Sequence, residues 1–287
     1  MVILLAVGAA IGWGASDYFG GDASRRDTPV FVIVAVAELL GGVLLAPILI
    51  FRGTSLPADP RLLFAALAGV AVTVELSLIY RALARGQAFI TAPIGALGAS
   101  AAVTVGLVGG NPLDLSVAIG LACALSGGAI SAWTTPTADA SSADPAWQTA
   151  AICLGASAAV AIMLTTLHAA GRLDPVWSTA TEHTSTAVSA GVAALLSTRG
   201  SRSKRLRVSI QMPRLALIAT VGVGGDLAYT AASHRGAVSI VAAISSLYPV
   251  TTIALGRLLQ RHCATRLQIV GSLVALFGAA LLGAATR

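Results

Sequence analysis

Apolar runs alternate with short polar connections along almost the whole chain. A helix needs about 20 mostly apolar residues to cross the hydrocarbon core of a membrane, which is about 30 Å thick. We expect ten transmembrane helices, because ten segments come close to this length. They run over Val2–Phe19, Val30–Phe51, Leu62–Ala84, Phe89–Val108, Leu115–Trp133, Trp147–His168, Val176–Ser197, Leu215–Ser233, Val238–Leu258 and Leu267–Ala284.

Two of these segments depart from a plain apolar run. The seventh is the least apolar, because Glu182, His183 and several Ser and Thr interrupt it. The first opens the sequence without a basic region before it, so we interpret it as a transmembrane helix and not as a cleavable signal peptide. The missing basic region leaves open whether the true start of the protein lies further upstream.

Composition supports a multi-pass protein of the plasma membrane. Only 10% of the residues are charged, against about 25% in soluble domains. The net charge of +6 comes from basic residues between the apolar runs. Such residues fit the anionic leaflet of a membrane, so we expect the lipid bilayer and no nucleic acid as a partner. The spacing of Cys123, Cys153 and Cys263 matches no metal-binding motif, and we expect no metal and no cofactor.

The basic residues also predict an orientation. With ten helices, most of them fall in the odd-numbered connections, and the connection between Arg199 and Arg214 is the richest. Because basic connections stay in the cytoplasm, this count places both termini outside the cell.

Two parts of the chain resemble each other. GLACALSGGAI at Gly120–Ile130 aligns without a gap with GSLVALFGAAL at Gly271–Leu281, at an offset of 151 residues. Upstream, Tyr80–Gly86 parallels Tyr229–Gly236, and an apolar segment with a proline follows each of them. We interpret these matches as an internal repeat.

The repeat predicts the domain organisation. We expect one five-helix repeat over 1–133, a linker rich in Ser, Thr, Ala and Pro over 134–146, and a second repeat over 147–287. Five helices per copy is an odd number, so the second copy must enter the membrane the other way up. Inverted repeats of this kind are typical of secondary transporters, which work by alternating access.

The order of these motifs resembles the drug/metabolite transporter superfamily, EamA type. It comprises Y-x-A-L-x-x-G, then a segment with a proline, then G-x-x-x-A-L-x-G-x-x-L, and Trp13-Gly14 is similar to the family's first-helix motif. The resemblance implies ten helices, a central cavity between the halves, and export or exchange of amino acids or amphiphilic compounds. It also implies cytoplasmic termini, opposite to the charge count, so the orientation stays open. Family members often carry an acid before the last helix of each repeat, which only the first copy keeps, as Asp114.

Four acidic residues fall inside the apolar segments: Asp17, Glu38, Glu75 and Asp226. A charge inside a membrane is costly, so it usually faces a partner or a wet cavity. Asp226 shares a helical face with Tyr229, and Glu75 precedes it by the repeat offset of 151. Two carboxylates near the two-fold axis could bind a proton or a substrate amine. The alternative is that these acids only lock helices together.

Aromatic and hydroxyl groups complete the candidate site. Ser245 and Tyr248 share a face of the ninth segment with Pro249, which can kink that helix, and Trp13 could stack on a substrate. The candidate substrate-binding or proton-binding residues are Asp226, Glu75, Tyr229, Ser245, Tyr248, Trp13, Asp17 and Glu38.

The sequence supports other functions less well. Gly224-Gly225-Asp226 comes near an intramembrane protease motif, but Val223 occupies its first glycine position, so we expect no enzyme and no catalytic residues. A carrier of nucleotide sugars or lipid-linked sugars would need basic residues in its core, where Arg81 alone qualifies. A non-transporting partner subunit, a homodimer, and coupling to protons all stay open, since a uniporter needs no carboxylate.

Overall fold

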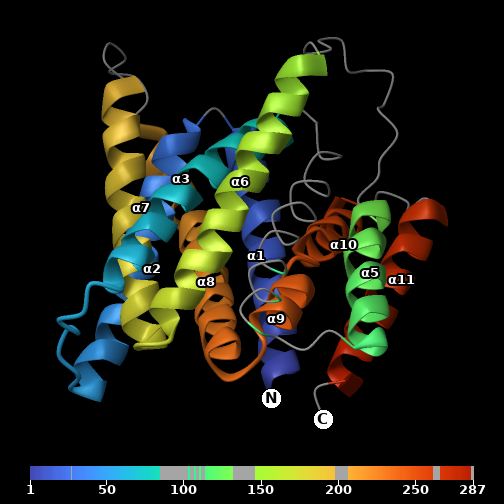
Figure 1. The fold of residues 1–287 in the computed structure, drawn as a ribbon. Helices are drawn as coiled ribbons and strands as arrows, with labels where there is room; N and C mark the ends of the chain where they lie inside the picture. The colour runs from blue at the N-terminus through green and yellow to red at the C-terminus, as the bar shows by residue number, and fades with distance from the viewer. Residues whose placement is uncertain are drawn as a thin grey trace.

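The computed structural model of the protein describes residues 1–26, 28–84, 103, 107, 110, 114–131, 146–197, 206–260 and 266–285. These residues are mostly helical, as the fold class predicted (Figure 1). The helices are α1 (Val2–Ser24), α2 (Val30–Arg52), α3 (Leu62–Ala84), α5 (Leu115–Ser131), α6 (Ala146–Gly171), α7 (Pro175–Ser197), α8 (Leu206–Arg235), α9 (Val238–Ser245), α10 (Tyr248–Gln260) and α11 (Arg266–Ala285).

Six stretches of the described chain are long and apolar enough to cross a membrane. They are Val2–Ser24, Val30–Arg52, Leu62–Arg81, Leu154–Gly171, Gln211–Arg235 and Val238–Leu259, and Leu115–Gly127 is a shorter apolar helix. Large apolar side chains such as Leu4, Phe51 and Leu273 lie exposed on the outside, where lipid would cover them. The predicted helix Phe89–Val108 and linker 134–146 lie almost wholly outside the described residues, so ten helices remain a prediction.

The predicted helix Val238–Leu258 is wrong in one respect, because it is two helices. α9 ends at Ser245 and α10 begins at Tyr248, so that Ser246 and Leu247 form a break. Pro249 explains this break, since proline has no backbone N–H to donate to the preceding turn. The eighth helix also begins earlier than predicted, at Leu206 and not at Leu215, because it continues into a more polar stretch.

The helices α5 and α11 pack in a reciprocal way. A Cβ added to Gly127 would lie 2.3 Å from the nitrogen of Ala275, and one added to Gly278 would lie 2.3 Å from the nitrogen of Ala124. The two contacts are equivalent in the repeat, because Gly127 and Ala124 of α5 correspond to Gly278 and Ala275 of α11 at the offset of 151 residues. Glycine is required at both places, because the helix backbones touch there.

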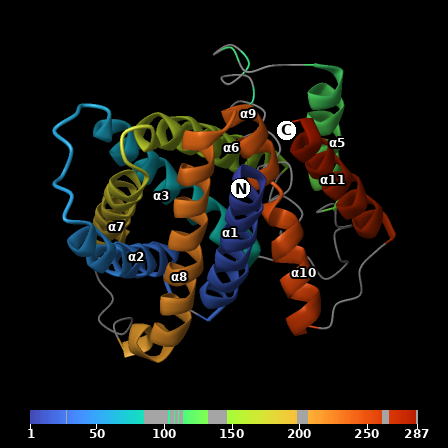
Figure 2. The ribbon, with the colours of Figure 1, turned by 90° about the horizontal axis from the view of Figure 1, so that it is seen from below.

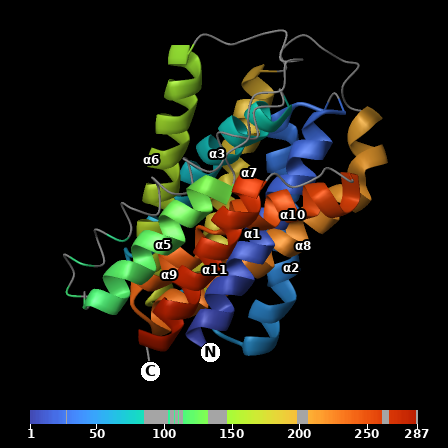
Figure 3. The ribbon, with the colours of Figure 1, turned by 90° about the vertical axis from the view of Figure 1, so that its right-hand side faces the viewer.

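The same contacts give the relative direction of α5 and α11. Gly278 meets Gly120 and Ala124, while Gly127, further along α5, meets Gly271 and Ala275, earlier in α11. The two helices are therefore antiparallel. They lie side by side at one flank of the bundle (Figure 3). This is the relation that two inverted copies of one repeat would give.

The helix α7, which contains the predicted segment that polar residues interrupt, packs against α2 and α3. The Ser185 hydroxyl donates a 2.7 Å hydrogen bond to the carbonyl of Ala66, and the hydroxyls of Thr73 and Ser189 are 2.6 Å apart. A Cβ on Gly69 would lie 2.4 Å from the carbonyl oxygen of Glu182, so the α3 and α7 backbones are in close contact. The polar residues that weaken α7 as an apolar segment thus face protein.

The middle of the bundle is formed by α1 and α8. They run side by side, with α2 and α7 on one flank and α5 and α11 on the other (Figure 2). A Cβ on Gly12 would lie 2.8 Å from Gly225, so this contact too depends on small residues. α1 begins and α11 ends at the same end of the bundle, which we call the terminal end (Figure 1).

Candidate functional site

A cavity of about 50 Å³ lies at the centre of the bundle. A water molecule needs roughly 10–15 Å³ of such space, so the cavity has room for a few waters. α1, α2, α3, α6 and α8 contribute to its wall, together with the break between α9 and α10. The lining residues are Trp13, Ser16, Asp17, Glu38, Val72, Glu75, Leu76, Val160, Met163, Leu164, Gly222, Asp226, Ser246 and Tyr248.

Six of the eight candidate residues from the sequence come together in this wall. The carboxylates come from four helices: Asp17 from α1, Glu38 from α2, Glu75 from α3 and Asp226 from α8, and the aromatic residues are Trp13 and Tyr248. The residues that are equivalent in the two repeats, Glu75 and Asp226, line the same cavity. Their role in binding a substrate or a proton stays a prediction.

Two carboxylates in the wall have no partner among the described residues. Asp17 and Glu75 are 4% and 7% exposed, and neither forms a hydrogen bond or an ion pair with another described residue. A buried polar group without a partner costs about 1–3 kcal/mol, and more if it is charged. Within the described part of the chain, these two side chains face only the cavity and its wall.

Asp226 is held more firmly than these two acids. The indole nitrogen of Trp13 donates a 2.8 Å hydrogen bond to its Oδ1. The Trp13 ring is itself fixed between Tyr229 and Tyr248, with ring centroids 5.3 and 6.5 Å away. Gly225 makes this approach possible, since a Cβ there would lie 2.7 Å from the Trp13 ring.

The remaining two candidates, Tyr229 and Ser245, do not line the cavity. The Tyr229 hydroxyl donates a 2.7 Å hydrogen bond to the carbonyl of Leu164, and its side chain is fully buried. The Ser245 hydroxyl donates to the carbonyl of Ala6 at 3.3 Å, and it is Ser246 that faces the cavity. Both contacts are of the kind that hold helices together.

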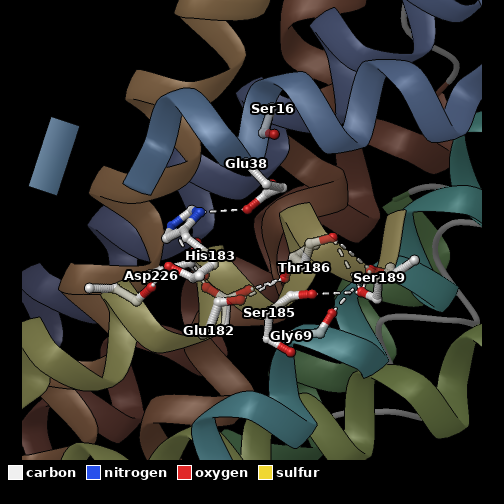
Figure 4. Close-up of polar contacts among 12 residues, drawn as sticks. Ser16, Glu38, Gly69, Glu182, His183, Ser185, Thr186, Ser189 and Asp226 are labelled. Atoms are coloured by element: carbon white, nitrogen blue, oxygen red, sulfur yellow. Dashed lines mark hydrogen bonds and ion pairs between the residues drawn. The ribbon is translucent and has the colours of Figure 1, made fainter. Parts of the chain in front are cut away.

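Two ionisable residues beside the cavity were missed in the sequence. His183 of α7 lies between helices, with its Nδ1 2.5 Å from Oε2 of Glu38 and its Nε2 3.3 Å from Oδ2 of Asp226 (Figure 4). Oε2 of Glu182 is 3.7 Å from the same Nε2. We call Glu38, Glu182, His183 and Asp226 the His183 cluster. The sequence did contain one indication of this cluster: Glu182 and His183 are adjacent ionisable residues in a segment that is otherwise suited to a membrane.

Contacts between the two sequence halves also lie near both ends of the bundle. At the terminal end, Arg52 of α2 forms two hydrogen bonds, of 3.0 and 2.8 Å, with Asp174 at the start of α7. At the opposite end, Nε of Arg214 lies 3.4 Å from Oδ2 of Asp22, and Gln211 donates a 2.7 Å hydrogen bond to Thr28. The central cavity thus lies between two sets of polar contacts that join the halves.

The comparison of the sequence with protein families agrees with this architecture. The EamA-like transporter family matches residues 1–133 and 146–284, as two successive copies. The chain belongs to the EamA-like transporter family. As an EamA-like protein, it is a multi-pass membrane protein of a transporter family.

The fold of this EamA-like chain also has a solved counterpart. A crystal structure aligns with 98% of this chain and 97% of its own, with a TM-score of 0.69 and 18% sequence identity. At this identity the likeness shows the fold alone. No curated protein matches the sequence.

Proposed function

We propose that this EamA-like protein is a secondary transporter for a small amine-bearing metabolite, such as an amino acid or an amphiphilic amine. The observation that carries the proposal is the central cavity with four carboxylates in its wall. Among the described residues that line it, none is Lys or Arg. Such a wall attracts an ammonium group and repels an anion that carries no ammonium group, such as a phosphate.

The aromatic residues of the wall suit the same ligand. Trp13 and Tyr248 offer ring faces, which attract an organic cation and also pack against its apolar part. The carrier of nucleotide sugars or lipid-linked sugars, our alternative from the sequence, is less well supported, because its phosphates would meet Asp17, Glu38, Glu75 and Asp226.

Exchange against protons follows from the same wall. Four carboxylates cannot all stay charged in a cavity that holds only a few waters, so protons must neutralise some of them when no cation is bound. A bound ammonium group would replace such protons. The cycle that we propose thus releases protons when the amine binds and takes them up when it leaves.

Alternating access would move the amine across the plasma membrane. The cavity of about 50 Å³ is too small for an amino acid, so the halves would separate at one end to admit it. Breaking the Arg52–Asp174 contact would open the terminal end, and breaking the Asp22–Arg214 and Thr28–Gln211 contacts would open the other. Inverted repeats can exchange conformations to do this in turn, and the antiparallel α5 and α11 support such a relation.

Transport in proteoliposomes that contain a pH-sensitive dye tests the proposal. Phenethylamine and phenylalanine carry an ammonium group, and 3-phenylpropionate is the matched compound without one. We expect the first two, or at least one of them, to drive a proton movement that Asp226→Asn abolishes, and 3-phenylpropionate to drive none. Equal transport of 3-phenylpropionate, or transport of a nucleotide sugar in place of the amines, would refute the proposal.

A further inference from the structure

One imidazole lies behind two carboxylates of the cavity wall. Nδ1 of His183 is 2.5 Å from Oε2 of Glu38, and its Nε2 is 3.3 Å from Oδ2 of Asp226 (Figure 4). Glu38 and Asp226 line the cavity, whereas His183 does not line it and is only 1% exposed. Glu38 belongs to the first matched copy of the family and Asp226 to the second. The ring therefore joins one carboxylate of each copy.

The contacts of the ring suit an imidazolium. A neutral imidazole has one N–H and one lone pair, so it can donate to a partner on one side only. Here a carboxylate oxygen faces each nitrogen, and Oε2 of Glu182 lies 3.7 Å from Nε2, on the side of Asp226. A lone pair on either side would meet an anion, whereas an imidazolium has an N–H for each side. In this form His183 supplies one positive charge to a buried place.

Acidic groups outnumber positive ones around this ring. Among the described residues that line the cavity none is Lys or Arg, and α6 contributes only apolar side chains. Burial favours the protonated form of a carboxylic acid, whereas a positive neighbour favours the ionised form. The charge of His183 therefore opposes protonation of the carboxylates that it touches. The described titratable groups at the ring and in the wall beside it are Asp17 of α1, Glu38 of α2, Glu75 of α3, Glu182 of α7, Asp226 of α8 and Tyr248 of α10.

Further contacts fix the orientation of the His183 cluster. The indole nitrogen of Trp13 donates a 2.8 Å hydrogen bond to Oδ1 of Asp226, so that Oδ2 is the oxygen that faces the ring. The Thr186 hydroxyl donates a 2.9 Å hydrogen bond to Oε1 of Glu182, the oxygen further from the ring. Gly41 leaves room for the imidazole, because a Cβ there would lie 2.8 Å from Nδ1. Such supporting contacts hold a binding group in one geometry before its ligand arrives.

We propose that His183 is a positioning residue for the transported amine: its positive ring keeps the carboxylates of Glu38 and Asp226 ionised and oriented in the cavity wall. The ammonium group then meets one anion from each copy of the repeat. The charge of the ring does not cancel this attraction, because three carboxylates surround it and it lies behind the wall. The part played by the amine rests on the proposed function, whereas the ionisation of the two carboxylates can be measured without a substrate.

His183→Gln and His183→Lys separate the charge of this residue from its size, because both new side chains are unbranched and only that of Lys is positive. Binding of radiolabelled phenethylamine to the purified, detergent-solubilised protein is measured between pH 6 and pH 8.5, where an alkylammonium stays charged. Near pH 6 we expect His183→Gln to bind at least about tenfold more weakly than the wild type, the effect of one pH unit on proton binding. This difference should narrow as the pH rises and the carboxylates lose their protons. His183→Lys should keep most of the affinity.

His168→Gln is the matched control, because His168 lies in α6 and does not line the cavity. It should bind phenethylamine like the wild type at each pH. Wild-type affinity in His183→Gln would overturn the proposal. So would an equal loss in His183→Gln and His183→Lys at every pH, because His183 would then only hold helices together.

Infrared spectroscopy at pH 7 tests the ionisation without any amine, because a protonated carboxyl group has a C=O stretching band that a carboxylate lacks. We expect this band to grow in His183→Gln, and to grow less when Asp226→Asn is also present. No growth of the band in His183→Gln would overturn the proposal. A wild type that binds no amine would instead refute the proposed function, and the infrared result would still decide the role of His183. Circular dichroism and gel filtration confirm that each variant is folded, and His183→Asn replaces His183→Gln if the latter fails this check.

Discussion

The reciprocal contact between α5 and α11 can be tested by adding one methyl group at a time. In Gly278→Ala the new Cβ would lie 2.3 Å from the nitrogen of Ala124, and in Gly127→Ala it would lie 2.3 Å from the nitrogen of Ala275. Carbon and nitrogen atoms that are not bonded do not approach so closely, and the atoms in the way are backbone. Each substitution must therefore push α5 and α11 apart.

The expected cost follows from overpacking, which destabilises a well-packed core by about 1–3 kcal/mol. Glycine to alanine inside a helix also stabilises the helix by up to about 1 kcal/mol. Gly224→Ala in α8 is the matched control, because Gly224 is exposed and a Cβ there would meet nothing within 4 Å. All three variants gain the same helix propensity from glycine to alanine. The difference in free energy of unfolding between each α5 or α11 variant and Gly224→Ala therefore gives the cost of overpacking.

Reversible unfolding in detergent micelles measures this difference. We expect Gly278→Ala and Gly127→Ala to be less stable than Gly224→Ala by about 1–3 kcal/mol, and by similar amounts, because the two sites are equivalent. If either variant were as stable as Gly224→Ala, the close reciprocal packing would be refuted. A large loss at one site and none at the other would refute the two-fold relation of the repeats.

Three further predictions concern the site and its ends. Trp13→Phe should lower the free energy of unfolding by about 1.5–3 kcal/mol, since it removes a hydrogen bond to the carboxylate of Asp226. The loss should be smaller when Asp226→Asn is already present. Equal losses with and without Asp226→Asn would contradict an energetic role for this hydrogen bond. Asp174→Asn should favour opening at the terminal end. A cysteine introduced at Ser246 should then be labelled faster from that side. An unchanged labelling rate would show that the Arg52–Asp174 contact does not hold this end closed. Burial would raise the pKa of Asp174, but its hydrogen bonds from Arg52 and the α7 backbone hold the pKa below its ordinary value. The Arg52–Asp174 contact should therefore persist at neutral pH and be lost only as the pH falls through that lowered pKa. Labelling of the cysteine at Ser246 that already rises near pH 6 would contradict this prediction.

The sequence indicated helices well where apolar length decides them. Val30–Phe51 and Leu62–Ala84 were placed almost to the residue as α2 and α3, because the thickness of the bilayer sets the length of such runs. The repeat offset of 151 was also informative, since it paired Glu75 with Asp226 and both line the cavity. What the sequence could not give was the break at Ser246 and Leu247, because proline can either kink a helix or end it.

The site was predicted less completely than the fold, for a physical reason. Helical periodicity tells which residues share a face, but it does not tell which neighbour that face meets. Tyr229 shares a face with Asp226, yet its hydroxyl reaches α6, and Ser245 faces α1. His183 was set aside as a residue that weakens an apolar segment. Its role depends on Glu38 and Asp226, which are distant in sequence and near only in the fold.

Accessibility of the cavity from both sides tests the central claim most directly. Ser246→Cys, in a variant without Cys123, Cys153 and Cys263, places one thiol in the cavity wall, and Ser178→Cys gives a fully buried control. Right-side-out and inside-out vesicles would be treated with a membrane-impermeant cationic thiol reagent. We predict labelling of Ser246→Cys from both sides, slowed by the transported amine, and no labelling of Ser178→Cys. Labelling from one side only, or none from either, would contradict a central site that opens to each side in turn.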